Sequence, residues 1–353
     1  MTNGSSLNET MGLDLSDKTG VYVVLDHEGE VCREGKVALT RQALSRAFGG
    51  GSPCLVAIEV GTHSPWVSRE LALLGHEVVI GNPRQVKLIS QNKKKSDRED
   101  ALLLARLARL DRRLLRPVQH RGEQAQADLA MLRARSLLVA GRTSLINSVR
   151  GMVKTTGLRL PRCSAESFAA RAQPHLPREL VPALEPLLAE ITSLTARIKQ
   201  ITHAIEHAAA ERYPETQQLR QVPGVGLICS LTYVLTLEEP QRFRRSRAAG
   251  AYLGLVPRQR QSGEQQPQMH ITKAGDVALR SVLVQSAQYI LGRYGPDSDL
   301  RRWGLKLAGE GNKARRKKAV IAVTRKLAVL LHHLWSTGQV YEPLRQADLQ
   351  TVG

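Results

Sequence analysis

The sequence is poor in cysteine and in long apolar runs. It has four cysteines among 353 residues, and no two of them have the C-x-x-C spacing typical of a zinc site. Nothing in their placement requires disulfides, so we expect a reducing, cytoplasmic environment. No apolar run is long enough to cross a bilayer, and the polar start MTNGSSLNET does not have the apolar segment of a signal peptide. The first ten residues are expected to form a disordered tail.

Acidic and aromatic residues are also scarce. The chain has 51 Lys and Arg against 32 Asp and Glu, a net charge of +19, and only 4% aromatic residues. Such an excess of positive charge indicates a polyanionic partner, most often nucleic acid. An anionic membrane is the weaker alternative, because the charge is spread along the chain and does not lie on one amphipathic helix. So few rings argue against base stacking as the main mode of nucleic-acid recognition.

The first third of the chain has the pattern of an α/β domain. A strand pair is predicted from about Met11 to Val37, and PCLVAIEV reads as a buried strand. A helix, a further strand that stops at Asn82-Pro83, and a helix capped by Ser96 follow. Strands followed by strand–helix alternation predict an α/β domain over residues 11–118.

The rest of the chain is predicted to be mostly helical. One long helix is expected over residues 122–157, and a heptad seam of apolar residues runs from Leu184 to Ala208. The seam fits a coiled coil between two chains or an amphipathic helix packed within its own domain. The further predicted parts are a helical linker with an oligomerisation role over residues 119–214, a helical domain over 215–340, and a tail over 341–353.

Two aspartates begin the helix that Ser96 caps, next to a run of lysines. Asp97 and Asp100 are three residues apart and therefore share one helix face, where two like charges repel unless a cation lies between them. Asp14 in the first strand and Glu59 at the end of the buried strand could join them, and four such carboxylates suit Mg²⁺ and phosphoryl-transfer chemistry. Taken one at a time, the helix aspartates have an ordinary explanation as acids in a first turn, and Asp14 as a turn residue. The lysines that we expect to contact phosphate beside this site are Lys93, Lys94 and Lys95.

The order of these motifs resembles that of the DEDD transposases of bacterial insertion sequences, which are described as bridge-RNA-guided recombinases. The resemblance is carried by GLD with Asp14, AIE with Glu59 and KSDREDALLLARL with Asp97 and Asp100. In the second half it is carried by VPGVGLICSLTYVLTLEEPQRFRRSRAAGAYLGLVPRQRQSG and ITKAGDVALR. It spans about residues 11–335. It implies a RuvC-like domain of the RNase H fold, then a coiled coil that mediates assembly, then a domain with a catalytic serine.

By motif position the resemblance identifies the serine as Ser262, in PRQRQSGEQQ. A serine hydroxyl can displace a deoxyribose oxygen from phosphorus and conserve the bond energy as a phosphoserine ester. Arg258, Arg260 and Lys273 are the nearby cations that could offset the phosphate charge. The resemblance also implies a structured guide RNA, so that protein contacts need only read shape and backbone.

Further candidate contacts are a glycine turn and several basic runs. VPGVG, with Gly224 and Gly226, resembles a helix-hairpin-helix turn whose backbone amides hold phosphate, although ordinary helix–helix turns look similar. The basic candidates, which could equally be solvated surface, are Arg112, Arg113, Arg116, Lys313, Arg315, Arg316, Lys317 and Lys318.

These features together predict a transposase that recombines double-stranded donor and target DNA as a homo-oligomer, with Mg²⁺ and Ser262 in the active site. We expect it in the bacterial cytoplasm, associated with the nucleoid when bound, and not at a membrane. Two alternatives stay open at this point. One is a RuvC-type nuclease in which Mg²⁺-activated water attacks and the serine is incidental. The other is a non-catalytic protein that binds nucleic acid.

Overall fold

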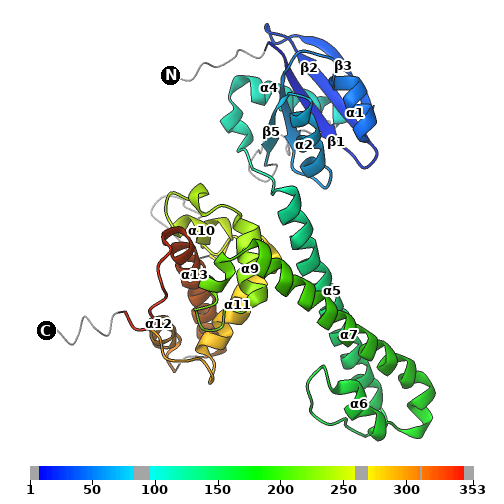
Figure 1. Cartoon of the computed structure of the whole chain (residues 1–353), viewed down its shortest axis with the longest axis vertical. Helices are drawn as coiled ribbons and strands as arrows, with labels where there is room; N and C mark the ends of the chain where they lie inside the picture. The colour runs from blue at the N-terminus through cyan, green and yellow to red at the C-terminus, as the bar shows by residue number, and fades with distance from the viewer. Residues whose placement is uncertain (1–7, 83–95, 259–268, 311, 346–353) are drawn as a thin grey trace, which may run out of the picture. The chain divides into compact units, whose positions relative to one another are not determined.

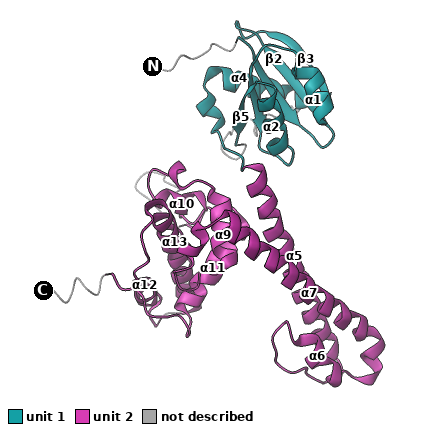
Figure 2. Ribbon diagram, viewed as in Figure 1, with its two compact units in different colours: residues 1–121 teal, residues 122–353 magenta. Residues whose placement is uncertain are grey.

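The computed structural model describes residues 8–82, 96–258, 269–310 and 312–345. The chain divides into two compact units, residues 1–121 and 122–353 (Figure 2). No helix in the described ranges is long and apolar enough to cross a membrane.

The first unit is built on a five-stranded sheet in the order β3-β2-β1-β4-β5 (Figure 1). β1, β2 and β3 are antiparallel neighbours, whereas β1, β4 and β5 run parallel. The predicted strand pair is therefore three strands, because the polar, largely exposed VCREGKVA forms the edge strand. The strands are β1 (Thr10–Leu15), β2 (Thr19–Leu25), β3 (Val31–Ala38), β4 (Leu55–Glu59) and β5 (Glu77–Gly81).

Helices cover both faces of this sheet. Leu44 and Leu71, from the first two helices, pack with Met11 and Ile58 on one face. The third helix packs on the opposite face, with Leu104 against residues of β4 and β5. This mixed α/β layering is compatible with the RNase H-like expectation. The helices are α1 (Arg41–Phe48), α2 (Ser64–Leu73), α4 (Asp97–Leu110) and the short η1 (Arg112–Leu115).

Two helices of 32 residues each begin the second unit and pack along each other. They are α5 (Glu123–Lys154) and α7 (Val181–Arg212), and α6 (Phe168–Ala172) lies between them in the chain with η2 (Gln173–His175) and η3 (Arg178–Leu180). The heptad positions Leu184, Ile191, Ile198 and Ile205 are buried, and α5 supplies the opposing apolar side chains. A helix of the same chain thus occupies the seam that we considered as a contact between subunits.

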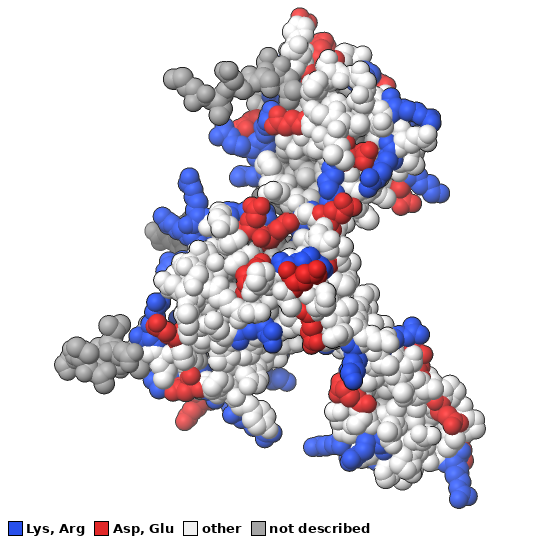
Figure 3. Space-filling view, viewed as in Figure 1, with Lys and Arg blue, Asp and Glu red and all other residues white. Residues whose placement is uncertain are grey.

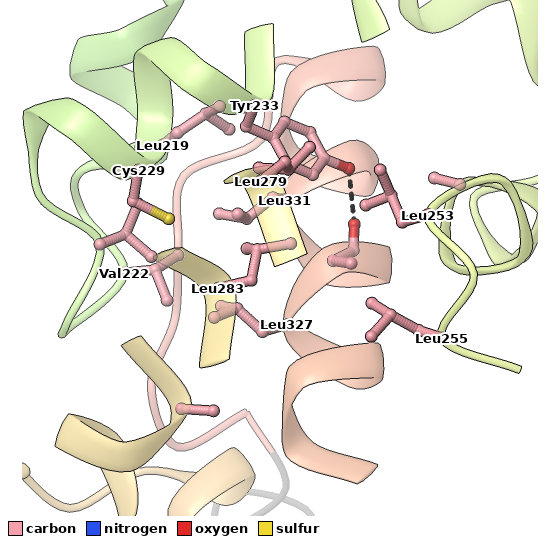
Figure 4. Packing of buried hydrophobic residues seen from close by; sticks show 14 of the residues in the cluster. Leu219, Val222, Cys229, Tyr233, Leu253, Leu255, Leu279, Leu283, Leu327 and Leu331 are labelled. Atoms are coloured by element: carbon pink, nitrogen blue, oxygen red, sulfur yellow. Dashed lines mark hydrogen bonds between the residues drawn. The ribbon is translucent and has the colours of Figure 1, made fainter. Parts of the chain in front are cut away.

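The remaining helices enclose the largest core of the chain. Tyr233 is fully buried there, and its hydroxyl donates a hydrogen bond of 2.6 Å to the carbonyl of Ala328 (Figure 4). Leucines of α9, α11 and α13 fill the space around it, as their spacing of three and four residues requires. The elements are α8 (Glu215–Leu219), α9 (Leu227–Leu237), η4 (Pro240–Arg242), α10 (Arg247–Tyr252), α11 (Val277–Leu291), α12 (Asp299–Ala308) and α13 (Lys313–Thr337).

Candidate active site

Asp14 and Glu59 lie side by side at the ends of two neighbouring strands. β1 and β4 are parallel, and their last paired residues are Leu13 and Ile58. Asp14 and Glu59 are the next residues on the two strands, and both side chains are half-buried. The strand register therefore brings two of the four predicted carboxylates to the same edge of the sheet.

Both side chains belong to the sheet face that α4 covers. Successive side chains of a strand alternate between faces, so Asp14 shares the face of Gly12, and Glu59 that of Ala57. Gly12 lies directly under the backbone of Ala101 in α4, and Ala57 packs in the apolar cluster of the same helix. Asp14 and Glu59 are thus on the side of the sheet where the other two acids begin a helix.

The first turn of α4 lies toward these strand ends. The helix crosses Gly12 at Ala101 and Ala105, and its later residue Leu107 packs with Leu55 at the start of β4. α4 therefore runs opposite to β1 and β4, and its N-terminus points to the ends that carry Asp14 and Glu59.

Ser96 caps α4, as predicted, because its Oγ accepts a hydrogen bond of 3.2 Å from the Glu99 amide. Asp97 is exposed, whereas Asp100 is half-buried. The Oδ1 atom of Asp100 is buried and has no hydrogen-bond partner among the residues that the structure describes. A buried carboxylate oxygen without a partner is costly in free energy, and a cation would remove that cost.

The donor set suits a hard divalent cation. Asp14, Glu59 and Asp100 offer only carboxylate oxygens, the ligands that Mg²⁺ prefers. In the described part of the chain, no group of three or more His, Cys, Asp and Glu side chains stands ready to hold a metal ion. The fold thus brings the acids to one end of the sheet, and the ligand set itself is taken up below as a proposal.

Acids pair with three of the described arginines in and just after α4. Arg98 donates to Glu34 across 2.7 Å, and Arg113 lies 3.1 Å from Asp111. Arg112 is bonded to Glu77. Such pairing offsets the positive charge of the three arginines, which weakens the case for Arg112 and Arg113 as phosphate contacts. Lys93, Lys94 and Lys95 lie outside the described residues.

A short antiparallel pairing holds the two ends of the segment that contains Ser262. The amide of Arg258 donates to the carbonyl of His270 across 2.9 Å, and the amide of Thr272 to that of Val256 across 2.9 Å. Ser262 and Arg260 themselves lie outside the described residues. Arg258 precedes the serine by four positions in the chain, and the pairing fixes the backbone of Arg258 itself.

Two glycines let the chain cross itself below this pairing. A Cβ on Gly254 would lie 2.3 Å from the amide nitrogen of Ala274, and one on Gly275 2.6 Å from the Cα of Leu253. Lys273, a candidate phosphate contact, has a left-handed backbone with φ of 56°, and its amide donates to Gly254 across 3.0 Å. A non-glycine residue in this region is uncommon, so the surrounding contacts hold Lys273 in place.

Arg280 fastens the same crossing, and sequence reasoning missed it. Its Nη1 donates to the carbonyl of Gly275 across 2.6 Å and to that of Leu253 across 3.2 Å. In the sequence it is one more arginine of a basic chain on a helix. The sequence signal is limited to Gly254 and Gly275, which indicate a close approach of two backbone segments. The carbonyls of such a crossing need hydrogen-bond donors.

The VPGVG segment forms a tight turn between α8 and α9. Gly224 has φ of 84°, and a Cβ there would lie 2.9 Å from the Cδ1 of Tyr289 and 3.0 Å from the carbonyl oxygen of Ser286. Gly226 precedes α9 and gives it no side-chain cap. Both the backbone conformation and the lack of space therefore require glycine at Gly224.

The start of α13 concentrates positive charge without local compensation. Asn312 caps the helix by accepting from the amides of Ala314 and Arg315, and the first turn has no acid. Cations at a helix N-terminus oppose the helix dipole and repel one another. The exposed basic residues of these first turns are Lys313, Arg315, Arg316, Lys317 and Lys318.

Two of the cysteines, Cys54 and Cys229, are poor candidates for a nucleophile. All four are free, and burial raises the pKa of Cys54 and of Cys229 to about 11. His76 accepts from the Cys54 amide across 3.2 Å and binds the carbonyl of Phe48 through its other nitrogen, at 3.0 Å. Both thiols are therefore protonated at neutral pH and serve packing.

Comparisons with known proteins cover both units of the chain. A transposase family model of the DEDD type matches residues 11–157, and one described as Transposase IS116/IS110/IS902 family matches residues 216–301. Transposase domains of the DEDD type typically use divalent metal ions.

Several curated proteins are similar over most of their length. A probable family 20 transposase of Pseudomonas aeruginosa is 32% identical over 94% of this chain and 98% of its own. The transposase for insertion sequence element IS1111A of Coxiella burnetii is 29% identical over 94% of this chain and 90% of its own. The transposase for insertion sequence element IS1328 of Yersinia enterocolitica is 29% identical over 82% of this chain and 86% of its own. The chain therefore belongs to the IS110-family transposases of insertion sequences, enzymes that cleave and join DNA.

Proposed function

We propose that this transposase recombines donor and target DNA at defined sites through a serine nucleophile and a magnesium-binding carboxylate site, guided by a structured RNA. The observation that carries the proposal is the placement of Asp14, Glu59 and the first turn of α4 at one end of the sheet, together with the family motif that contains Ser262.

Asp14, Glu59, Asp97 and Asp100 would hold the metal. When bound, Mg²⁺ supplies Lewis acidity toward phosphate oxygens. The buried Oδ1 of Asp100 supports this role, because no described residue hydrogen-bonds to it. Asp97 is exposed at the start of the same helix and is therefore open to DNA as well as to solvent.

Ser262 would attack phosphorus through its Oγ. A bond from Oγ to phosphorus forms, the bond from phosphorus to the deoxyribose oxygen breaks, and the serine proton leaves as the sugar oxygen takes one up. Arg258, Arg260 and Lys273 would offset the charge on the phosphate during this exchange. The fixed backbone at Lys273 supports its assignment, since it limits where that side chain emerges.

Guide RNA and DNA would be bound mainly through their backbones. Lys and Arg side chains are spread over the surface in view (Figure 3), as suits partners recognised by shape and charge. The turn at Gly224 and Gly226, the lysines Lys93 to Lys95 and the start of α13 with Arg315, Arg316 and Lys317 are the contacts that we propose.

The protein would act as a homo-oligomer in the bacterial cytoplasm. Because α5 fills the apolar seam of α7, association would use other surfaces of the second unit. A RuvC-type nuclease that uses activated water is the second candidate, since the carboxylates would serve it equally well. A non-catalytic nucleic-acid-binding protein is the third, and the family assignment makes it the weakest.

Covalent trapping separates the first two candidates. DNA with a nick next to the scissile bond should accumulate a protein–DNA conjugate that survives denaturant, because the leaving strand is lost. Ser262→Ala should abolish the conjugate and the recombination while RNA and DNA binding persist. Ser336→Ala, an exposed serine at the end of α13, is the matched control and should behave as the wild type. If Ser262→Ala still cleaves DNA in magnesium, water is the nucleophile.

RNA dependence is tested separately. The protein should be isolated with RNA, and sequencing that RNA should identify one structured species. A preparation free of RNA that still recombines at a defined site would leave direct DNA readout as the targeting mode.

A further inference from the structure

Two exposed tyrosines lie five residues apart in the chain, Tyr289 in the last turn of α11 and Tyr294 just beyond that helix. The chain has only 4% aromatic residues, and most of them pack into cores. Tyr289 is 46% and Tyr294 68% exposed, and Tyr252 is 42% exposed with its ring packed against Phe243. Two exposed rings five residues apart are unusual in a protein that buries most of its aromatics, and they indicate a surface with a partner.

Tyr289 is held directly against the turn at Gly224. A Cβ at Gly224 would come within 2.9 Å of the Tyr289 ring, so the absence of a side chain lets ring and turn touch. Ile290, the next residue of α11, is buried and fixes the helix beneath them. The ring is therefore a rigid part of the surface next to the turn that resembles a phosphate-binding hairpin.

An arginine packs on the second ring and is not neutralised. The guanidinium of Arg293 lies 4.3 Å from the centroid of the Tyr294 ring. Arg293 is exposed, and no acid pairs with it in the described part of the chain. One face of the Tyr294 ring is thus covered by a cation, while the side chain as a whole stays open to solvent.

We propose that Tyr289, Arg293 and Tyr294 form a stacking site for unpaired bases of DNA, beside the turn at Gly224. Flat rings accept any base on their faces, and Arg293 supplies the positive charge that attracts the adjoining phosphate. A paired base presents no free face, so the site would select strands that are opened, nicked or gapped. The inference rests on the proposed action on DNA and does not depend on Ser262.

DNA is the occupant that we favour because the family acts on DNA strands that must be opened to be exchanged. The site is local and does not extend along the chain, in keeping with the low aromatic content. It would hold one or two bases at a junction while backbone contacts elsewhere supply most of the affinity.

The test compares a labelled DNA duplex with the same duplex containing a gap of a few nucleotides, by fluorescence anisotropy at constant salt. Stacking of one base contributes about 1–3 kcal/mol, so the wild type should bind the gapped DNA roughly 5- to 150-fold more tightly. Tyr294→Ala and Tyr289→Ala should lose that preference and bind the duplex as before. Tyr294→Phe should keep it, because the ring remains.

The controls separate stacking from folding. Tyr252→Ala removes the other exposed tyrosine, at 42%, whose ring packs against Phe243, and should leave the preference unchanged. Ser262→Ala should also bind gapped DNA more tightly than the duplex, whether or not that serine is the nucleophile. The proposal is overturned if the wild type binds both DNAs equally, or if Tyr294→Ala weakens both to the same extent. It is also overturned if single-stranded RNA displaces the labelled gapped DNA more strongly than single-stranded DNA of the same sequence does, and if Tyr294→Ala removes that difference. RNA would then be the ligand of the site.

Discussion

No side chain fits between Gly12 of β1 and Ala101 of α4. A Cβ at Gly12 would lie 1.9 Å from the carbonyl oxygen of Ala101 and 2.7 Å from the amide nitrogen of Ala105. Helix backbone thus rests directly on strand backbone, two residues before Asp14. This contact sets how closely the first turn of α4, with its two aspartates, approaches the strand ends.

Gly12→Ala should therefore push α4 away from the sheet. The obstacle is backbone and cannot rotate aside, so we expect a loss of more than about 2 kcal/mol in the free energy of unfolding, with loss of DNA cleavage. Urea unfolding monitored by circular dichroism measures the first effect. Gly51→Ala, where nothing lies within 4 Å of the added Cβ, is the control and should change neither stability nor activity.

Asp100→Asn should separate metal binding from folding. The substitution keeps the shape and removes a buried negative charge without a hydrogen-bond partner on Oδ1. In metal-free buffer we expect the free energy of unfolding to change by less than about 1 kcal/mol, while DNA cleavage is lost. Magnesium at saturating concentration should raise the Tm of the wild type by a few degrees and leave that of Asp100→Asn unchanged.

Glu99→Gln is the matched control for that experiment. Glu99 lies on the same turn, is 45% exposed and pairs with Arg98 at 3.2 Å. It should retain both cleavage and the magnesium-dependent rise in Tm. An equal rise in Tm for Asp100→Asn and wild type would count against a metal site that includes Asp100.

The N-terminal fold could be predicted because its signals are local. PCLVAIEV is apolar at every core position, and Ser96 lies where a cap is needed, so the strand and the helix start follow from neighbouring residues. The convergence of Asp14 and Glu59 could be predicted too, because parallel strand ends meet at one edge. The edge strand β3 was missed as a separate strand, since only Val37 among its residues is buried.

Features that depend on distant parts of the chain could not be read in this way. Arg280 binds carbonyls that no pattern around it reveals. The seam from Leu184 to Ala208 shows that one helix face must be covered, and the periodicity is the same whether the cover is α5 or a second chain. The connection between α5 and α7, which includes α6, lets the chain fold back so that α5 covers this face of α7.

Ile191→Asp should consequently unfold the α5–α7 pair rather than separate subunits. Ile191 is 1% exposed against α5, and an unpaired charge there should cost about 3 kcal/mol or more. Limited proteolysis should show new cleavage within α5 and α7. Ala196→Asp, on the exposed face of the same helix, should resist proteolysis as the wild type does. A dissociated oligomer with intact helices would instead place the seam between chains.

Asp128, near the start of α5, binds residues at the end of α7. The free energy that this contact contributes should depend on pH. Burial opposes its ionised form, but hydrogen bonds from Arg212 at 2.7 Å and Tyr213 at 2.8 Å leave the pKa of Asp128 below its usual value. The stabilisation is therefore complete above the unfolded pKa of about 3.9 and is lost as pH falls through the lower folded value. Asp128→Asn should lower the free energy of unfolding by about 1.5–3 kcal/mol at pH 7 and by less near pH 3. Denaturant titrations at the two pH values measure this difference.

The first turn of α13 should show opposite effects on stability and binding. Lys313 and Arg316 oppose the helix dipole, and neither has an acid in that turn to offset its charge. Lys313→Gln with Arg316→Gln should therefore raise the free energy of unfolding by about 0.5–1 kcal/mol. If both contact phosphate, the slope of log K against log salt for DNA binding should become shallower by about 2, and the affinity difference should vanish in high salt. Anisotropy titrations over a salt series measure the slope, and thermal unfolding of the free protein measures the stability. Higher stability with an unchanged slope would mean that this charge does not serve DNA binding.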